Sequence, residues 1–182
     1  MKNPHLNLQP TSYNLQANQG FTLIELLLYV AISSVILLVI SLFLQTLLES
    51  RIKNQTIAEV EQQGLQVMQI ITQAARNAEA ITSPALGASA STLSLDVITG
   101  TNDPTMFDVS SGIMRITEGA GSAVSLTNSR ITASSLSFSN LSRASTPGTV
   151  RIQFTLTHVN PEGRNEYNFA KTFTSSATLR QP

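Results

Sequence analysis

The fold of this chain is decided by residues 20–48, which read GFTLIELLLYVAISSVILLVISLFLQTLL. Within this stretch, the 19 residues from Leu26 to Leu44 carry no charge and are rich in leucine, isoleucine and valine. At about 1.5 Å per residue, a helix of this length covers the ~30 Å hydrocarbon core of a bilayer. The stretch therefore predicts a membrane-spanning helical half over residues 21–48.

One acidic side chain, Glu25, lies just inside the N-terminal end of the apolar stretch. A charge costs about 2.5–3.5 kcal/mol at the centre of a membrane helix on insertion scales, and less near its edge. An opposite charge placed beside the carboxylate would offset the cost of removing it from water. The position of Glu25 therefore predicts a positively charged partner at the membrane boundary.

The apolar stretch is preceded by a polar segment, residues 1–20, which reads MKNPHLNLQPTSYNLQANQG. A secretory signal peptide places its apolar region before the cleavage site, and both are discarded. Here the apolar stretch follows the polar segment, so a cut after Gly20 would leave the membrane span on the mature chain. Glycine at that position lets the backbone extend into a protease cleft without a side-chain clash.

The motif G-F-T-L-I-E at residues 20–25 resembles the prepilin cleavage and methylation motif of type IV pilins and type II secretion pseudopilins. In that family, a membrane-embedded aspartic peptidase cuts after the glycine and methylates the new N-terminal residue. The resemblance implies a prepilin peptidase cleavage site at Gly20 and Phe21, with N-methylation of Phe21. It also implies that Glu25 serves assembly, by meeting the Phe21 amine of a neighbouring subunit or by neutralising that end during docking. The competing interpretation is an ordinary signal anchor with a charge near its end.

The resemblance also implies a location and a set of partners. The leader, residues 1–20, would be cytoplasmic, and the chain would cross the bacterial cytoplasmic (inner) membrane once before entering an extracytoplasmic filament. Lys2 is the one basic side chain of the leader, whereas Arg51 and Lys53 follow the span, so this orientation rests on the motif rather than on a positive-inside bias. The expected partners are the prepilin peptidase, membrane lipid, the inner-membrane assembly platform, and other major and minor pilins or pseudopilins.

A helical pattern continues beyond the predicted span. Apolar or small residues recur there in alternating steps of three and four, at Ile57, Val60, Gly64, Val67, Ile71, Ala74 and Ala78. This spacing places them on one face of a helix, and Pro84 ends the pattern. The sequence therefore predicts an amphipathic helical half over residues 49–83, with the helix reaching about Ile81. Gly64 on this face allows close packing or a bend.

Residues 84–182 are rich in serine, threonine, glycine and asparagine, with short alternating runs. The clearest run is Val150–Val159, where apolar and polar side chains alternate as in a half-buried strand. Further strands are predicted at residues 92–99, 113–117, 123–127, 134–139 and 167–173. The glycine-rich residues 118–122 predict a hairpin loop. We therefore expect an α+β fold, in which a long N-terminal helix packs on an antiparallel β-sheet, and this order agrees with the pilin fold.

Composition and motifs indicate a structural role rather than an enzyme. No G-x-S-x-G, H-E-x-x-H, P-loop or G-x-G-x-x-G motif occurs, and no cofactor is expected. His158 is interpreted as a packing or rim residue at a strand end. Asp103 and Asp108 share a polar loop but lack EF-hand spacing, so no metal site is expected. The chain has 11 basic and 11 acidic residues and no cysteine, which excludes disulfides and gives no reason to predict a direct nucleic-acid partner.

Two functions remain open at this stage. The favoured one is a minor pilin or pseudopilin, similar to the J type and to its pilus counterpart W, in a type IV pilus or a type II secretion pseudopilus. The alternative is a signal-anchored extracytoplasmic enzyme or binding protein outside any filament. Processing at Gly20 distinguishes the two.

Overall fold

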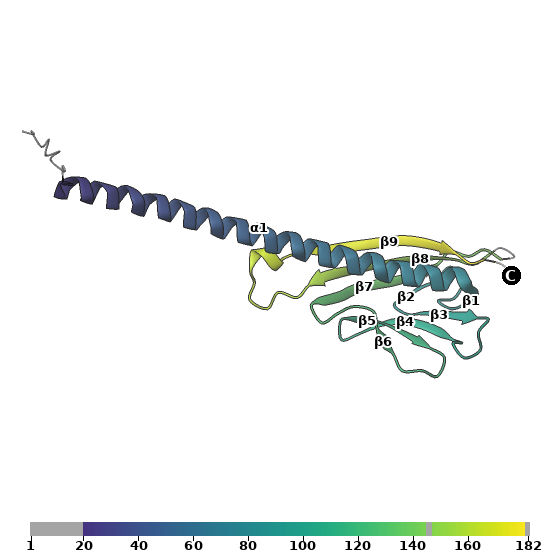
Figure 1. Ribbon diagram of the computed structural model, residues 1–182. Helices are drawn as coiled ribbons and strands as arrows, with labels where there is room; N and C mark the ends of the chain where they lie inside the picture. The colour runs from purple at the N-terminus through teal and green to yellow at the C-terminus, as the bar shows by residue number, and fades with distance from the viewer. Residues whose placement is uncertain (1–19, 145–146, 181–182) are drawn as a thin grey trace, which may run out of the picture. The chain divides into compact units, whose positions relative to one another are not determined.

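A computed structural model of the chain describes residues 20–144 and 147–180. They form one long N-terminal helix followed by antiparallel β-strands, as Figure 1 shows. The α+β class predicted from the sequence is thereby confirmed. The chain divides into two compact units, and the boundary between them lies within the helix, between Gln45 and Thr46. The first contains the apolar half of the helix, and the second contains the remainder of the helix and all the described strands.

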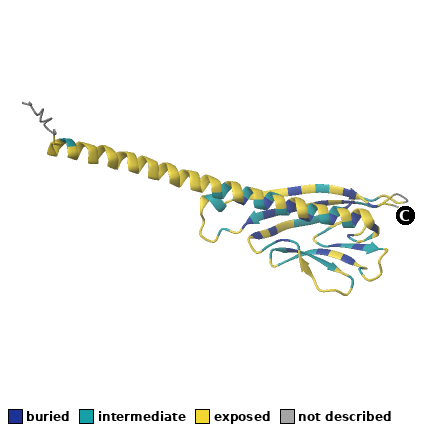
Figure 2. Cartoon of the chain, viewed as in Figure 1, coloured by how far each residue is buried: buried dark blue, intermediate teal, exposed yellow. Residues whose placement is uncertain are grey.

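Helix α1 runs from Leu23 to Asn77. Among the described residues, it is the one helix that is long and apolar enough to cross a membrane. The side chains of its first half are exposed almost throughout (Figure 2), as expected for a surface that contacts lipid or other helices. In its second half a single face is buried, at Thr56, Val60, Gly64, Val67, Ile71 and Ala75.

This buried face agrees with the predicted stripe at its centre and differs at its ends. Ile57 and Ala74 are half-buried, and their neighbours Thr56 and Ala75 take the fully buried positions. The helix also ends earlier than predicted, because Ala78–Ser83 forms strand β1 rather than a last helical turn. Since β1 pairs with β3 (Leu93–Val97), the backbone groups of these residues bond to a neighbouring strand instead of to the helix.

The strands form two sheets, where one sheet was predicted. The first has the order β1-β3-β4-β5-β6 and adds β4 (Thr105–Ser110), β5 (Ile113–Glu118) and β6 (Val124–Ser125). The predicted hairpin around residues 118–122 is confirmed, since Arg115 of β5 pairs with Ser125 of β6.

The second sheet has the order β2-β7-β8-β9. Its strands are β2 (Ser89–Ala90), β7 (Ile131–Asn140), β8 (Thr149–His158) and β9 (Ala170–Thr178). The short β2 pairs with β7. It therefore belongs to the second sheet, although β1 before it and β3 after it belong to the first. Hydrophobic alternation predicts which face of a strand is buried, but it does not predict which other strand pairs with it.

One predicted strand begins later than expected. Tyr167 was assigned to a strand over residues 167–173, but it belongs to a short 3-10 helix, Asn165–Tyr167, and β9 begins at Ala170. The Tyr167 ring stacks on the His158 ring with centroids 5.5 Å apart and planes 13° apart. Tyr167 is therefore held by its ring contact with His158 and not by pairing in the β-sheet, although the alternating pattern had included it in the strand.

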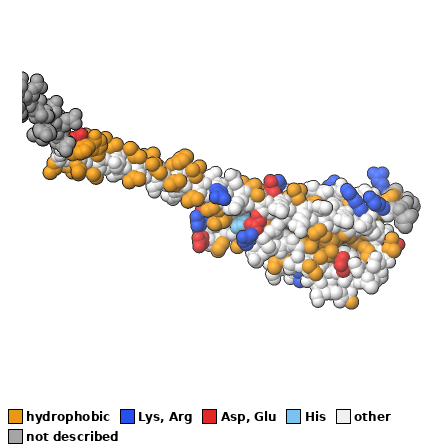
Figure 3. Space-filling model, in the orientation of Figure 1, with side chains coloured by type: hydrophobic (Ala, Val, Ile, Leu, Met, Phe, Trp, Pro, Cys, Tyr) orange, Lys and Arg blue, Asp and Glu red, His pale blue; other side chains and the backbone are white. Residues whose placement is uncertain are grey.

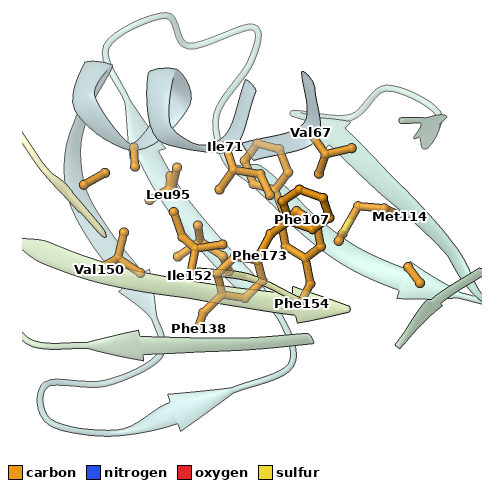
Figure 4. Close-up of a cluster of buried hydrophobic side chains, with 14 of the residues drawn as sticks. Val67, Ile71, Leu95, Phe107, Met114, Phe138, Val150, Ile152, Phe154 and Phe173 are labelled. Carbon is orange, nitrogen blue, oxygen red and sulfur yellow. The ribbon is translucent and has the colours of Figure 1, made fainter. Parts of the chain in front are cut away.

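One core joins α1 to both sheets (Figure 4). Val67 and Ile71 of α1 lie among Phe107 and Met114 of the first sheet and Phe154 of the second, and all five are fully buried. Side chains from three layers thus exclude water from a common interior, and burial of this apolar area stabilises the unit at about 25 cal/mol per Å².

Gly64 of α1 and the Phe173 ring of β9 approach each other closely in this core. A Cβ atom built on Gly64 would overlap that ring. The sequence allowed either close packing or a bend at Gly64, and the structure shows close packing.

We expect Gly64→Ala to lower the free energy of unfolding by about 1–3 kcal/mol, since overpacking outweighs the ~1 kcal/mol that alanine gains in helix propensity. Urea denaturation of the full chain in detergent micelles, followed by circular dichroism, measures the change. Gln66→Ala, on the exposed side of the same helix, is the matched control and should have little effect. Equal stability of the Gly64→Ala and wild-type proteins would show that the ring moves aside freely.

Candidate functional site

The residues that the sequence singled out lie at the start of α1, with Gly20 to Thr22 outside the helix and Glu25 in its first turn. Thr22 caps the helix: its Oγ1 accepts a hydrogen bond from the Glu25 N–H at 3.3 Å, and its carbonyl accepts one from the Leu26 N–H at 3.1 Å. Such a cap satisfies backbone donors that the first helical turn leaves unpaired.

Side chains one and two turns apart meet above this cap. The Tyr29 hydroxyl donates to Glu25 Oε1 at 3.4 Å, and the Tyr29 ring meets the Phe21 ring edge-on with centroids 6.0 Å apart. Tyr29 thus contacts both of the side chains to which the motif gives a role. The carboxylate of Glu25 lies at the end of the helix where the macrodipole is positive, which favours a negative charge.

The backbone ahead of the helix is open. Apart from its chain neighbours, no atom of the described residues lies within 4 Å of the position that a Cβ on Gly20 would occupy, and the Phe21 side chain is 74% exposed. The described part of the chain therefore leaves the bond between these two residues uncovered.

Thr22 and Tyr29 were not identified from the sequence as part of this site. A signal for Thr22 was present, because T-x-x-E at residues 22–25 is the pattern of a capping box. For Tyr29 the signal was its spacing of four residues from Glu25, which places two side chains on the same side of a helix.

A second cluster of polar side chains surrounds Glu59, a half-buried residue of α1. Its Oε1 accepts from Asn128 Nδ2 at 2.7 Å and from Arg130 Nε at 3.0 Å, and its Oε2 lies 3.8 Å from His158 Nε2. Figure 3 shows basic and acidic side chains gathered beside the pale-blue histidine. A single carboxylate therefore fastens the turn before β7 and the end of β8 to the helix.

A groove of about 1220 Å³ lies beside this cluster, between α1 and residues 125–130 and 158–167. Arg164 stacks over the Tyr167 ring at 5.5 Å from its centroid and forms an ion pair with Glu166. The hydrogen bond to Glu166 raises the pKa of Arg164. The pKa of Glu166 is lowered chiefly by a hydrogen bond from its own backbone. The hydrogen bond from Arg164 lowers it further. These contacts order the turn that leads into β9.

His158 ends β8, and it is 9% exposed, in agreement with the packing role predicted for it. Its Nδ1 is buried without a hydrogen-bond partner among the described residues. Its ring lies between the Glu59 carboxylate and the Tyr167 ring. This arrangement holds two chain segments together and, in the described part of the chain, presents no hydroxyl hydrogen-bonded to the imidazole.

Asp103 and Asp108 do not converge on one loop site. Asp108 lies in β4 and pairs with Arg115 of β5 through two hydrogen bonds, of 2.9 and 2.6 Å, whereas Asp103 Oδ1 faces the Val97 N–H at 3.4 Å. The hydrogen bond to Asp108 raises the pKa of the Arg115 guanidinium. No group of three or more His, Asp or Glu side chains with the spacing of a metal site occurs within residues 20–144 and 147–180.

We expect Glu59→Gln to lower the free energy of unfolding by about 1–2 kcal/mol, because the amide cannot replace the charge that Arg130 and Asn128 bind. Glu61→Gln is the matched control. Its carboxylate meets Lys171 at 2.6 Å on the surface, where an ion pair contributes about 0–1 kcal/mol. Urea denaturation of both variants, followed by circular dichroism, measures the difference, and an equal loss in the two would contradict the role of Glu59 as a fastening point.

Comparison with known proteins adds one finding. A family model described as the prokaryotic N-terminal methylation motif matches residues 15–41, which include Gly20, Phe21 and Glu25. Neither the search of curated proteins nor that of solved structures gave a significant match. The matched motif, together with an apolar helix long enough to cross a bilayer, supports a membrane-anchored, single-pass protein of a type IV pilin-like family.

Proposed function

We propose that this chain is a prepilin-type subunit that is cut between Gly20 and Phe21, methylated on the new Phe21 amine, and assembled into a filament. The observation that carries the proposal is the methylation motif at residues 15–41, placed at the start of an apolar helix. We assign the subunit to the minor pilins or pseudopilins, of J or W type, in a type IV pilus or a type II secretion pseudopilus. The order of helix and sheet domain and the absence of cysteine support that assignment.

The first step is processing by the prepilin peptidase. A peptidase binds an extended backbone, and residues 20–22 precede the helix. Gly20 adds no side chain that could block the cleft, and no described residue other than its chain neighbours crowds it. Cleavage on the cytoplasmic side of the inner membrane would leave the apolar half of α1 as the anchor of the mature chain.

Cleavage also creates the positive charge that Glu25 requires. The new amine lies one residue before the Thr22 cap, at the positive end of the helix, where a cation is unfavourable. Glu25, three residues after the cap, is the first-turn carboxylate that offsets it. Within one chain or between neighbouring chains, pairing the amine with the carboxylate offsets the free energy that each charge would cost alone in lipid.

Assembly is the second step. The first half of α1 exposes many leucine, isoleucine and valine side chains, and Figure 3 shows hydrophobic side chains along its visible face. Such a surface is suited to lipid and to the equivalent helices of other major and minor subunits, which the inner-membrane assembly platform would bring together. The role is structural, and the reaction on the chain is carried out by the peptidase.

We expect Gly20→Val to block processing, because a branched side chain would occupy the space that the extended backbone needs at the scissile bond. Mass spectrometry of the protein from cells with an active prepilin peptidase should show a methylated Phe21 terminus for the wild type and an uncut chain for the variant. Ile24→Val, a conservative change in the same motif, should be processed normally. An intact leader on the wild-type protein would exclude the prepilin assignment in favour of a plain signal anchor.

We expect Glu25→Ala to be cleaved but to enter filaments poorly, since the Phe21 amine then has no carboxylate to pair with. Glu25→Asp should have a partial effect, because the charge is kept but its reach is one methylene shorter. Tyr29→Phe is the matched control: it removes the 3.4 Å donor to Glu25 and keeps the carboxylate, so incorporation should be normal. Immunoblots of sheared filaments, normalised to total protein, give the incorporated fraction. Wild-type incorporation of Glu25→Ala would remove any role for this charge in assembly.

A further inference from the structure

Thr22 provides two acceptors to the first turn of α1, and only one of them depends on its side chain. Its carbonyl accepts from the Leu26 N–H at 3.1 Å, whereas its Oγ1 accepts from the Glu25 N–H at 3.3 Å. In an uninterrupted α-helix, the Glu25 N–H would donate to the carbonyl four residues before it, which is that of Phe21. The Thr22 hydroxyl therefore takes the place of that carbonyl, and the helix begins at the next residue.

The bond between Gly20 and Phe21 lies directly beyond this cap. A helix two residues longer would place Gly20 at the cap, a position that glycine tolerates. The Glu25 N–H would then donate to the Phe21 carbonyl. The Ile24 N–H would donate to the Gly20 carbonyl, which belongs to the bond that is cut in the proposed processing step. The longer helix would thus include the scissile bond in its first turn.

A ring contact shows that Phe21 lies outside the helical path. Its ring centroid is 6.0 Å from that of Tyr29, eight residues further along the chain. Eight residues of α-helix advance by about 12 Å, and long side chains on a helix all point back toward its N-terminus. Two rings on one continuous helix would keep that separation, so the contact belongs to the capped conformation.

We propose that Thr22 is a positioning residue for cleavage, because its hydroxyl cap holds the bond between Gly20 and Phe21 outside the helix, in the extended form that a peptidase binds. The inference rests on the proposed function and identifies what controls its first step. A chain with the longer helix must unwind two residues before it can bind. The apparent affinity for the peptidase therefore scales with the fraction of chains that are capped.

The size of the effect follows from this fraction. Loss of a cap shifts the equilibrium by up to about thirtyfold, and the upper end applies at a membrane boundary, where little water replaces the lost acceptor. If about nine-tenths of wild-type chains are capped, a thirtyfold shift leaves about one quarter of them competent. We expect a fall of about fourfold in kcat/KM, with kcat at saturating substrate unchanged.

Three substitutions separate the cap from the shape of the side chain. Thr22→Val keeps the branched shape and removes the acceptor, so it should show the fourfold fall. Thr22→Ser keeps the hydroxyl, and Thr22→Asn replaces it with an amide oxygen that also caps helices well, so both should be cleaved as the wild type is. The substrate is the full chain in detergent micelles, and release of the leader by a purified prepilin peptidase is measured over a range of substrate concentrations.

Amide hydrogen exchange of the uncut chain provides a measurement that does not involve the peptidase. In the described part of the chain, the Ile24 N–H has no hydrogen-bond acceptor, so its exchange should be fast in the wild type. In Thr22→Val it should slow about fourfold, because most chains then offer it the Gly20 carbonyl. The serine and asparagine variants should exchange as the wild type does.

The outcomes distinguish this inference from the proposed function. A wild-type chain that the peptidase leaves uncut would reject the proposed function. Cleavage of the wild type and of Thr22→Val with equal efficiency would overturn only the role of Thr22. A loss in Thr22→Asn as large as that in Thr22→Val, or a fall in kcat rather than a rise in KM, would show that the peptidase recognises the hydroxyl itself. Unchanged exchange of the Ile24 amide in Thr22→Val would also overturn the inference.

Discussion

The burial of one face of α1 is the constraint on which the rest of the second unit depends. Both sheets contribute side chains to the core beneath Val67 and Ile71, so neither sheet has a complete interior without the helix. At Gly64 the helix backbone comes close enough to contact the Phe173 ring. This contact aligns β9 with the helix, and the sheet built on β9 follows that alignment. A glycine in mid-helix, unfavourable for helix formation by itself, is thus explained by packing.

The same helix meets a different constraint at its other end. An apolar stretch that is exposed on all sides requires lipid or other helices, and a carboxylate at its start requires an opposite charge or a cap. Thr22 and Tyr29 provide local polar contacts to Glu25 and its backbone, and the proposed cleavage would provide the charge. Helix capping and charge pairing therefore meet at one residue, Glu25, the first through its backbone N–H and the second through its carboxylate.

Polar contacts in the second unit serve to position loops. Glu59 holds the turn before β7 and the end of β8, and the stack of His158, Tyr167 and Arg164 sets the approach to β9. These contacts lie in the turn that precedes β9, which begins at Ala170.

The sequence by itself determined the features that depend on consecutive residues. The long apolar half of α1, the buried centre of its second half and the alternation of β8 all follow from local composition and periodicity, because one helix or strand contains the whole pattern. Only the tertiary structure decided the end of α1 at Asn77, the division into two sheets and the network around Glu59. The first two depend on which strand offers the backbone partner, and the third joins residues about 70 to 100 positions apart, as Glu59 does with Asn128 and His158. Separation of that size leaves no periodic signal, because the energy of such a contact appears only once the intervening chain has folded.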